Sequence, residues 1–325
     1  MPSALASLLS RSLDFAGLFP PASLPVVEAV RILQEERGGG SAAMLGRFVC
    51  PVLRLEEVVA TLVAGDAPAE LAVLPRGGKT AGEFLANLET DLAVLRRVTR
   101  VHEGTATCDT IELRPPADAL AAPALRKLVA AVQALVGRHC DSLRQVFIEL
   151  APSPVLASQL EILGEHSAAA GASCSLGYKL RTGGSDAGAV PSAAQVAAAL
   201  GLAAALGLPM KCTGGLHHPL RSPAGDAPQH GFINLLVAAA FASTIRTEPG
   251  QLEAVIEETA TDAFSFQNQS LAWRGRTVDS ASIKTARRQV LLSFGSCYVD
   301  RPRLELQRLG GWPAPARAKL ARTAG

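Results

Sequence analysis

The chain has 325 residues, of which 48% are hydrophobic and only 4% aromatic, and its formal charge is +2 because 31 Lys and Arg balance 29 Asp and Glu. This composition excludes a disordered chain, which would be poor in Leu, Ile and Val, and a general nucleic-acid binder, whose surface would be strongly basic. Six widely spaced cysteines without a C-x-x-C motif, and no secretory signal before them, predict reduced thiols in a cytoplasmic protein.

Short β-type runs alternate with helical patterns through most of the chain. The runs lie at 44–52, 71–75, 110–113, 145–150, 175–180 and 209–213, and the helices that follow them at 55–62, 81–97, 126–136, 155–170, 193–206 and 231–244. The predicted strands begin about every 30 residues, which is the length of one strand–helix unit of a parallel sheet. Beyond residue 249, the pattern predicts a helix at 251–261, a weak strand at 264–273, a helix at 280–292 and a last strand at 293–299.

Eight strand–helix units predict a closed (β/α)8 barrel of the TIM type in a single domain, residues 44–312. An open doubly wound sheet is disfavoured because no Gly-rich phosphate loop follows the first predicted strand. We expect an N-terminal helical extension over residues 1–43 and a flexible basic tail over residues 313–325. The uncharged run at 187–210 holds two prolines and several glycines, and it favours a helix buried against the sheet over a membrane span.

Charged residues recur in the predicted strands or at their ends. Both faces of a helix-covered parallel sheet are buried, so such residues point into the barrel mouth, where active sites of this class lie, or pair internally. The set comprises six cations and two carboxylates: Arg47, Arg76, Arg114, Lys179, Arg181 and Lys211, with Glu112 and Glu149. The excess of cations predicts a small anionic substrate, although some members of the set would alternatively form structural ion pairs.

The most specific local signal is a pair of similar segments at the ends of successive strands. Each sets a lysine near the strand end and follows it with Thr-Gly-Gly: Lys179, Thr182, Gly183 and Gly184 in one, and Lys211, Thr213, Gly214 and Gly215 in the other. Glycines let backbone N–H groups approach an oxyanion, and threonine adds a hydroxyl donor. A plain turn into the next helix would also explain one such motif.

Neighbouring lysines can also take part in covalent catalysis. A second cation or desolvation lowers the pKa of a lysine, so that its free amine can form a Schiff base with a carbonyl. If Lys179 and Lys211 lie side by side, we expect each to lower the pKa of the other, with a further contribution from Arg181. Glu149 or Glu112 would then move protons at the carbinolamine and at the substrate carbon.

Over about 45 residues, from Leu176 to Leu220, these motifs resemble the class I, Schiff-base aldolases of the deoxyribose-phosphate aldolase type. The resemblance implies that Lys179 is the Schiff-base lysine, that Lys211 tunes it, and that the four glycines of the motifs are phosphate-loop positions. Two positions depart from the family pattern: Arg181 replaces a small residue, and Leu216-His217-His218-Pro219 replaces the usual continuation. The second departure is consistent with another substrate.

His217 and His218 are predicted to hydrogen-bond the substrate or to act as a general acid. Adjacent histidines at a turn point apart, and no nearby Cys or Glu completes a metal site, so we expect no metal. The chain also lacks a complete Walker loop, a G-x-S-x-G elbow, an H-E-x-x-H motif and a dinucleotide fingerprint. We therefore expect no organic cofactor.

The leading hypothesis is a barrel enzyme, a lyase of the aldolase type, that acts on a small anionic and phosphorylated carbonyl compound. One alternative is a phosphoribosyl-transfer enzyme, or a phosphosugar isomerase or epimerase, whose lysines only bind phosphate. Another is a non-catalytic ligand-binding barrel, because fold alone does not fix function. The expected partner is the substrate, with no nucleic acid and no membrane, and the sequence leaves a homo-oligomer open.

Overall fold

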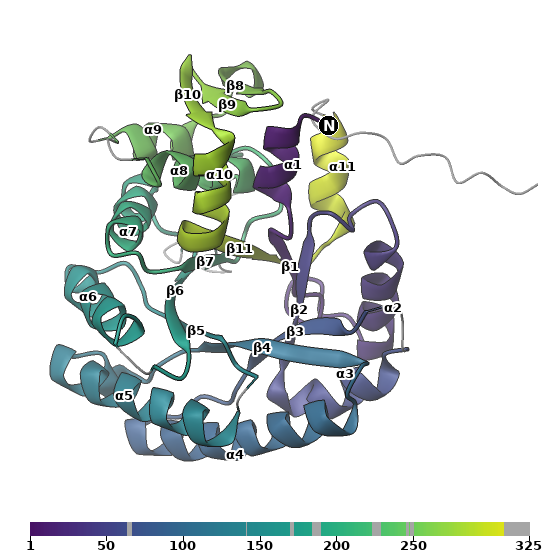
Figure 1. The fold of residues 1–325 in the computed structure, drawn as a ribbon, viewed down its shortest axis with the longest axis vertical. Coiled ribbons are helices and arrows are strands. Elements are labelled where there is room, and N and C mark those ends of the chain that lie inside the picture. The colour runs from purple at the N-terminus through teal and green to yellow at the C-terminus, as the bar shows by residue number, and fades with distance from the viewer. Residues whose placement is uncertain are drawn as a thin grey trace, which may run out of the picture.

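Eight parallel strands form a closed barrel in the computed structural model, which describes residues 1–63, 67–140, 142–169, 172–183, 190–222, 229–244, 247 and 250–308. The strands are β1 (Leu13–Phe15), β2 (Leu45–Pro51), β3 (Ala69–Leu74), β4 (Ala106–Leu113), β5 (Gln145–Glu149), β6 (Ser175–Arg181), β7 (Met210–Thr213) and β11 (Leu291–Ser296). Their order around the barrel is β1-β11-β7-β6-β5-β4-β3-β2 (Figure 1). The predicted closed (β/α)8 barrel in one domain is confirmed.

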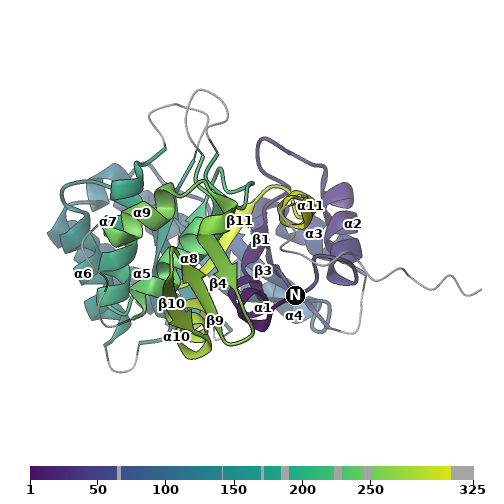
Figure 2. The ribbon, with the colours of Figure 1, turned by 90° about the horizontal axis from the view of Figure 1, so that it is seen from above.

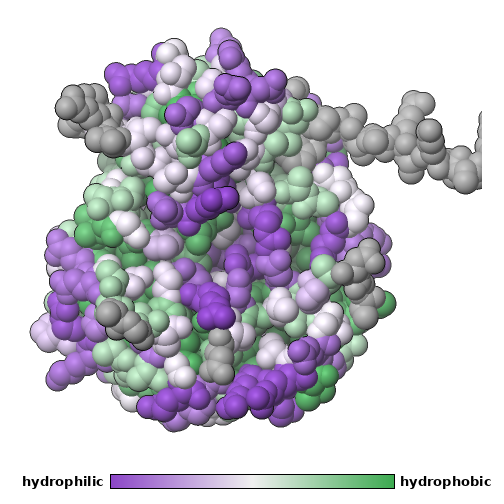
Figure 3. All heavy atoms as spheres, viewed as in Figure 1, coloured by the Kyte–Doolittle hydropathy of each residue, from purple (hydrophilic) through white to green (hydrophobic). Residues whose placement is uncertain are grey.

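One helix follows each barrel strand and covers it from outside. These helices are α2 (Val26–Arg37), α3 (Leu55–Thr61), α4 (Ala81–Val101), α5 (Ala122–His139), α6 (Leu156–Ser167), α7 (Ala193–Ala205), α8 (Phe232–Ala242) and α11 (Asp300–Arg308). Seen from above, α6 and α7 lie on one side of the barrel and α2 and α3 on the other (Figure 2). In the view of Figure 1, hydrophilic side chains gather over the centre of the barrel (Figure 3).

The helix ends follow from local sequence. The Thr80 side chain accepts a hydrogen bond from the Glu83 backbone N–H and so begins α4, and Ser192 and Gln195 form a capping box at the start of α7. Every residue of α8 from Phe232 to Phe241 is buried, which accounts for the absence of charge in that helix. Among the described residues, no helix combines the length and the apolar character that crossing a membrane requires.

The first strand of the barrel lies inside the segment that the sequence predicted to be an extension. Leu13, Asp14 and Phe15 form β1, which is buried and pairs with both β2 and β11, while α1 (Ser3–Leu9) precedes it. The predicted boundary at residue 44 is therefore wrong. A strand of three residues with a charged centre carries no alternation that a pattern can detect. The predicted tail at 313–325 lies outside the described residues.

The predicted seventh strand is wrong as well. Residues 264–273 belong to a separate antiparallel sheet of β8 (Phe264–Phe266), β9 (Ser270–Trp273) and β10 (Arg276–Asp279), placed between α9 (Gln251–Glu257) and α10 (Ser280–Thr285). This sheet lies beside α1 at the edge of the molecule (Figure 1), where the Ala4 N–H donates to the Gln267 carbonyl. The barrel instead passes directly from β7 to β11, the predicted last strand.

Buried Glu258, at the end of α9, holds this sheet through its carboxylate. One carboxylate oxygen accepts from the Trp273 indole N–H (3.1 Å) and from the Arg274 guanidinium (2.6 Å), and the other accepts from two backbone N–H groups. Arg274 and Gly275 both have positive φ and form the tight turn between β9 and β10. Because the chain reverses here, β9 and β10 pair with each other instead of joining the parallel barrel.

Candidate active site

Two lysines from neighbouring strands lie side by side in the barrel. The register pairs Glu149 of β5 with Lys179 of β6, and Lys179 with Lys211 of β7, so the three side chains lie on the same face of the sheet. All three lie within the last residues of their strands, at the carboxyl end of the barrel. The structure thus brings the two predicted lysines and Glu149 together where active sites of this fold lie.

Glu112 of β4 lies between the two lysine amines. Its Oε2 is 2.7 Å from Lys179 Nζ, and its Oε1 is 2.5 Å from Lys211 Nζ. Lys179 Nζ is also 3.1 Å from Glu149 Oε2, while Lys211 Nζ is 2.5 Å from an oxygen of Asp14. All five side chains are at least nine-tenths buried and form one continuous chain of ion pairs, which we call the lysine cluster: Asp14, Lys211, Glu112, Lys179 and Glu149.

The charges of this cluster differ from the sequence expectation. Burial lowers the pKa of Lys211, whereas Asp14 and Glu112 raise it, and the net direction is upward. Burial raises the pKa of Glu112, but the two lysines lower it to about 2. The expectation that the lysines depress each other's pKa is therefore wrong for Lys211, because a carboxylate separates the two amines. Lys211 remains an ammonium and Glu112 a carboxylate at neutral pH.

Asp14 is the member of the cluster that the sequence did not reveal. It lies in β1 and is 1% exposed. One carboxylate oxygen accepts from the Lys211 ammonium and from the Ser293 hydroxyl (2.7 Å), and the other accepts from the backbone N–H of Arg47 (2.8 Å). A Cβ at position 46 would lie 2.6 Å from this second oxygen, so Gly46 leaves room for the carboxylate. A charged residue between two apolar ones at 13–15 was the available signal, in a strand too short to recognise.

The two Thr-Gly turns pack directly against each other. The Thr182 hydroxyl lies 2.8 Å from the Gly214 carbonyl, to which it donates, and a Cβ on Gly183 would come within 2.9 Å of the Gly214 and Gly215 backbone. Gly214 and Gly215 have φ of +82° and +73°, which other residues rarely adopt. Within the described part of the chain, their N–H groups donate to no protein acceptor, so both are free for an oxyanion. Gly184 lies outside the described residues.

The four arginines of the predicted site are dispersed. Arg47 forms a two-pronged ion pair with Asp109 (2.7 and 2.8 Å), and Arg76 pairs with buried Asp91 of α4 (2.7 Å). Arg114 is 79% exposed in its side chain and lies 3.8 Å from Glu149, and Arg181 is exposed at the end of β6. Arg47 and Arg76 thus occupy the structural ion pairs that were the alternative interpretation, and none of the four contacts either lysine.

His217 and His218 point to different partners. His217 lies with Nδ1 3.3 Å from the Ser296 hydroxyl and Nε2 3.8 Å from Cys297 Sγ, and His218 Nδ1 lies 2.8 Å from Glu305. Burial, with help from Arg301 and His218, lowers the pKa of His217 to about 4, so its ring is neutral near pH 7. Among the described residues, no group of three or more His, Cys, Asp or Glu side chains is arranged to hold a metal.

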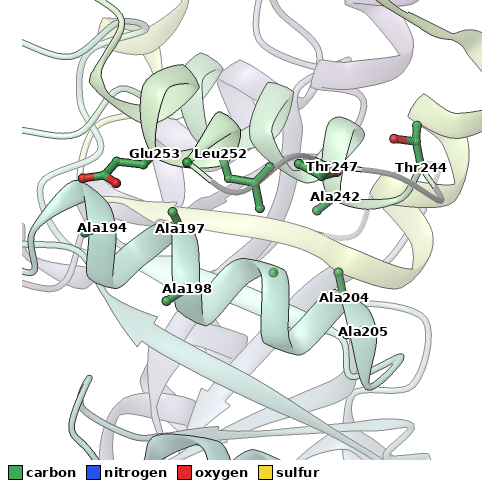
Figure 4. A pocket seen from close by; sticks show the side chains of 12 residues that line it. Ala194, Ala197, Ala198, Ala204, Ala205, Ala242, Thr244, Thr247, Leu252 and Glu253 are labelled. Atoms are coloured by element: carbon green, nitrogen blue, oxygen red, sulfur yellow. The ribbon is translucent and has the colours of Figure 1, made fainter.

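A surface cavity of about 540 Å³ lies apart from the lysine cluster. Its lining comes from α7, α8, α9 and the segment between the last two, and six of the twelve described lining residues are alanines (Figure 4). No member of the cluster contributes to its lining. Among the described lining residues, the polar side chains are Thr244, Thr247 and Glu253, without a cation or a cluster of charges, so we place the candidate active site in the barrel.

Known proteins give no direct guide to the role of this site. No protein-family model matches the chain, and a search of curated proteins finds no match either. The function must therefore be inferred from the geometry and charge of the residues themselves.

Proposed function

We propose that the protein is a lyase of the aldolase type, which forms a Schiff base between Lys179 and the carbonyl of a small anionic substrate. One observation carries this proposal: two buried lysines on adjacent strands share Glu112, and a second carboxylate, Glu149, contacts Lys179 but not Lys211. The proposal agrees with the local resemblance to deoxyribose-phosphate aldolases. The barrel fold is one on which enzymes of many classes are built.

Lys179 is the proposed nucleophile because its carboxylate contacts are longer than those of Lys211 and because Glu149 lies beside it as a proton acceptor. The Lys211 amine lies 2.5 Å from two carboxylate oxygens, and its side chain is 1% exposed. The Lys179 amine lies farther from Glu149, at 3.1 Å, and its side chain is 6% exposed. Glu112, with a pKa of about 2, stays a carboxylate. Glu149 is therefore the proposed acid–base group, and Lys211 holds Glu112 in place as a fixed positive charge.

The proposed reaction begins when Lys179 passes a proton to Glu149 and its Nζ bonds to the carbonyl carbon. The two protons that leave Nζ travel through Glu149 to the carbonyl oxygen, which departs as water and leaves a protonated imine. Glu149 then takes the proton of the substrate's β-hydroxyl, the bond between the α and β carbons breaks, and an aldehyde leaves. The electron pair remains as an enamine, which Glu149 protonates before water hydrolyses the imine.

The packed glycine turns are the proposed site for the substrate's anionic group, which we take to be a phosphate. Gly214 and Gly215, which directly follow β7, supply two N–H groups at positive φ that donate to no acceptor in the part of the chain that the structure describes. Such a backbone nest binds an oxyanion without a neighbouring cation. Lys179 and Lys211 are both engaged with carboxylates, so this proposal assigns anion binding to the backbone first.

Borohydride trapping tests the imine. Sodium borohydride added with candidate sugar phosphates or keto acids should attach the substrate irreversibly to wild-type protein and to Lys127→Arg, a control on the exposed face of α5. Lys179→Arg keeps the positive charge beside Glu112 but cannot form an imine, so trapping and turnover should both disappear. Turnover of a phosphosugar by Lys179→Arg would instead support the isomerase or transferase alternative, and absence of trapping with every candidate would overturn the proposal.

A further inference from the structure

Arg221 lies in the loop that joins β7 to α8, the same loop that carries Gly214 and Gly215. Its backbone N–H donates to the side-chain oxygen of Asn234 at 2.9 Å, and its guanidinium lies 3.2 Å from Nδ1 of His230. Both partners are buried, with exposures of 0% for Asn234 and 1% for His230. The backbone and the side chain of Arg221 are thus fixed independently of each other.

His230 holds this guanidinium without neutralising it. Its Nε2 lies 2.8 Å from the Pro191 carbonyl, which can only accept, so Nε2 carries the proton and Nδ1 has a free lone pair for Arg221. Burial lowers the pKa of His230, the Pro191 carbonyl raises it and Arg221 lowers it again, with a net direction downward. The imidazole is therefore neutral, and the charge of Arg221 is oriented but not compensated by its holder.

Asn234 fixes the loop beneath Arg221 just as firmly. Its side-chain amide donates to the carbonyls of Val255 and Glu258 at 2.7 and 2.8 Å, which ties the start of α8 to the end of α9. A Cβ at Gly231 would lie 2.2 Å from the Asn234 side-chain oxygen, so glycine is required at this close approach. Two buried polar side chains, Asn234 and His230, therefore position a single arginine.

The other cations considered for the site differ from Arg221. Arg47, Arg76, Lys179 and Lys211 each contact a carboxylate at 2.7 Å or less, and Arg114 lies near one. Within the described residues, Arg221 has no carboxylate within ion-pair distance, and it is half-buried where Arg181 is exposed. A buried scaffold that orients a guanidinium with no carboxylate partner among the described residues fits a site that binds an oxyanion.

We propose that Arg221 binds the anionic group of the substrate, with His230 and Asn234 as its positioning residues. The inference rests on the proposed function, since it names the residue that gives that reaction its preference for an anionic carbonyl compound. The loop leaves β7 two residues after Lys211, so the arginine and the glycine turn both belong to the connection that starts at the carboxyl end of the barrel. The ligand chemistry is an oxyanion, either a phosphate or a carboxylate.

Direct binding of inorganic phosphate tests Arg221 without any catalytic step. Titration of wild-type protein and of Lys179→Arg should give the same dissociation constant, and Arg221→Gln should weaken binding about tenfold or more. Arg221→Lys should recover part of the loss, and Arg288→Gln, at an exposed arginine, should leave binding unchanged. Unfolding midpoints of all variants show whether the fold is intact. Phosphate binding by folded Arg221→Gln at wild-type strength would overturn the proposal.

Trapping with matched carbonyl compounds then identifies the oxyanion. The half-saturating concentration of dihydroxyacetone phosphate, compared with dihydroxyacetone, reports a phosphate, and that of pyruvate, compared with acetone, reports a carboxylate. In Arg221→Gln the anionic member of one pair should need about tenfold more compound, while its neutral partner is unaffected. Equal shifts for charged and neutral members would contradict the role of Arg221.

His230 has its own test. Glutamine can accept from Arg221 and donate to the Pro191 carbonyl, so His230→Gln should bind phosphate nearly as well as wild type, whereas His230→Ala should resemble Arg221→Gln. Equal phosphate binding by His230→Ala and wild type would remove the positioning role. If phosphate binding depends on Arg221 but no carbonyl compound is trapped on Lys179, the Schiff-base reaction fails while the anion site stands.

Discussion

Lys179 and Lys211 are the same residue at paired positions of neighbouring strands, yet their surroundings differ. Lys211 is enclosed by Asp14 and Glu112 at 2.5 Å, and Asp14 is itself held by Ser293 and the Arg47 N–H. Lys179 shares Glu112 but has as its second partner Glu149, at the longer distance of 3.1 Å. This difference separates a lysine held closely by two carboxylates from one whose second carboxylate, Glu149, lies farther away and is the acid–base group in the proposed function.

The largest difference between the two lysines should appear in catalysis. Lys179→Arg is expected to lower turnover of an accepted substrate on the order of 1,000-fold or more, because an arginine cannot form the imine. The measurement is steady-state kinetics with a substrate that borohydride trapping has identified. Similar turnover in Lys179→Arg and wild type would remove the proposed distinction between the two lysines.

The free energy of unfolding should depend more on Lys211 than on Lys179. Lys211→Met leaves buried Asp14 without its cation and leaves Glu112 with Lys179 as its one remaining lysine partner, which should lower the free energy of unfolding by about 3–5 kcal/mol. Lys179→Met should cost less, because Glu149 is the more accessible carboxylate and exposed Arg114 lies near it. Urea unfolding of both variants makes the comparison. A larger loss for Lys179→Met would contradict the account of Lys211 as the fixed charge.

The pH dependence of stability sharpens the same comparison. Because the folded pKa of Glu112 is about 2, below its ordinary value of 4.5, its ionised form stabilises the fold above pH 4.5, and this contribution is lost as the pH falls toward 2. Urea midpoints measured from pH 5 down to 2 should therefore fall. In Glu112→Gln the part of the fall due to this residue should be absent, and an unchanged slope would argue against the ion pairs of the cluster.

The smallest expected effect concerns Ser293, which supports only the Lys211 side. Ser293→Ala removes one donor from buried Asp14 and should lower the free energy of unfolding by about 1–3 kcal/mol. The trapping rate at Lys179 should change little. A loss of trapping as large as that of Lys179→Arg would show that the two sides of the cluster cannot be separated in this way.

Much of the barrel could be predicted because six of its strands carry apolar runs at regular spacing. The runs at 44–52, 145–150 and 209–213 coincide closely with β2, β5 and β7. The first strand was missed because β1 is three residues long and is defined by its neighbours in space. The run at 264–273 has the composition of a strand, but Glu258 and the Arg274–Gly275 turn make it a hairpin outside the barrel.

The site was only partly predictable for a related reason. Four members of the cluster were identified because a charged residue in a buried strand must point into the barrel mouth or form an internal ion pair: Lys179, Lys211, Glu112 and Glu149. Which charges meet depends on register, and this is why Arg47 and Arg76 pair with Asp109 and Asp91 instead of joining the lysines. Arg221 lies in a loop, where no periodic pattern marks it, and only its contacts with His230 and Asn234 single it out.

Peptide mapping after borohydride reduction is the most direct test of the proposal that Lys179 carries the imine. Trypsin does not cleave after a modified lysine, so substrate on Lys179 would leave a joined peptide of residues 145–181 with added mass, while substrate on Lys211 would leave residues 182–221 joined. We predict the added mass on residues 145–181 alone. Added mass on residues 182–221, or on neither peptide with any sugar phosphate or keto acid, would contradict the account.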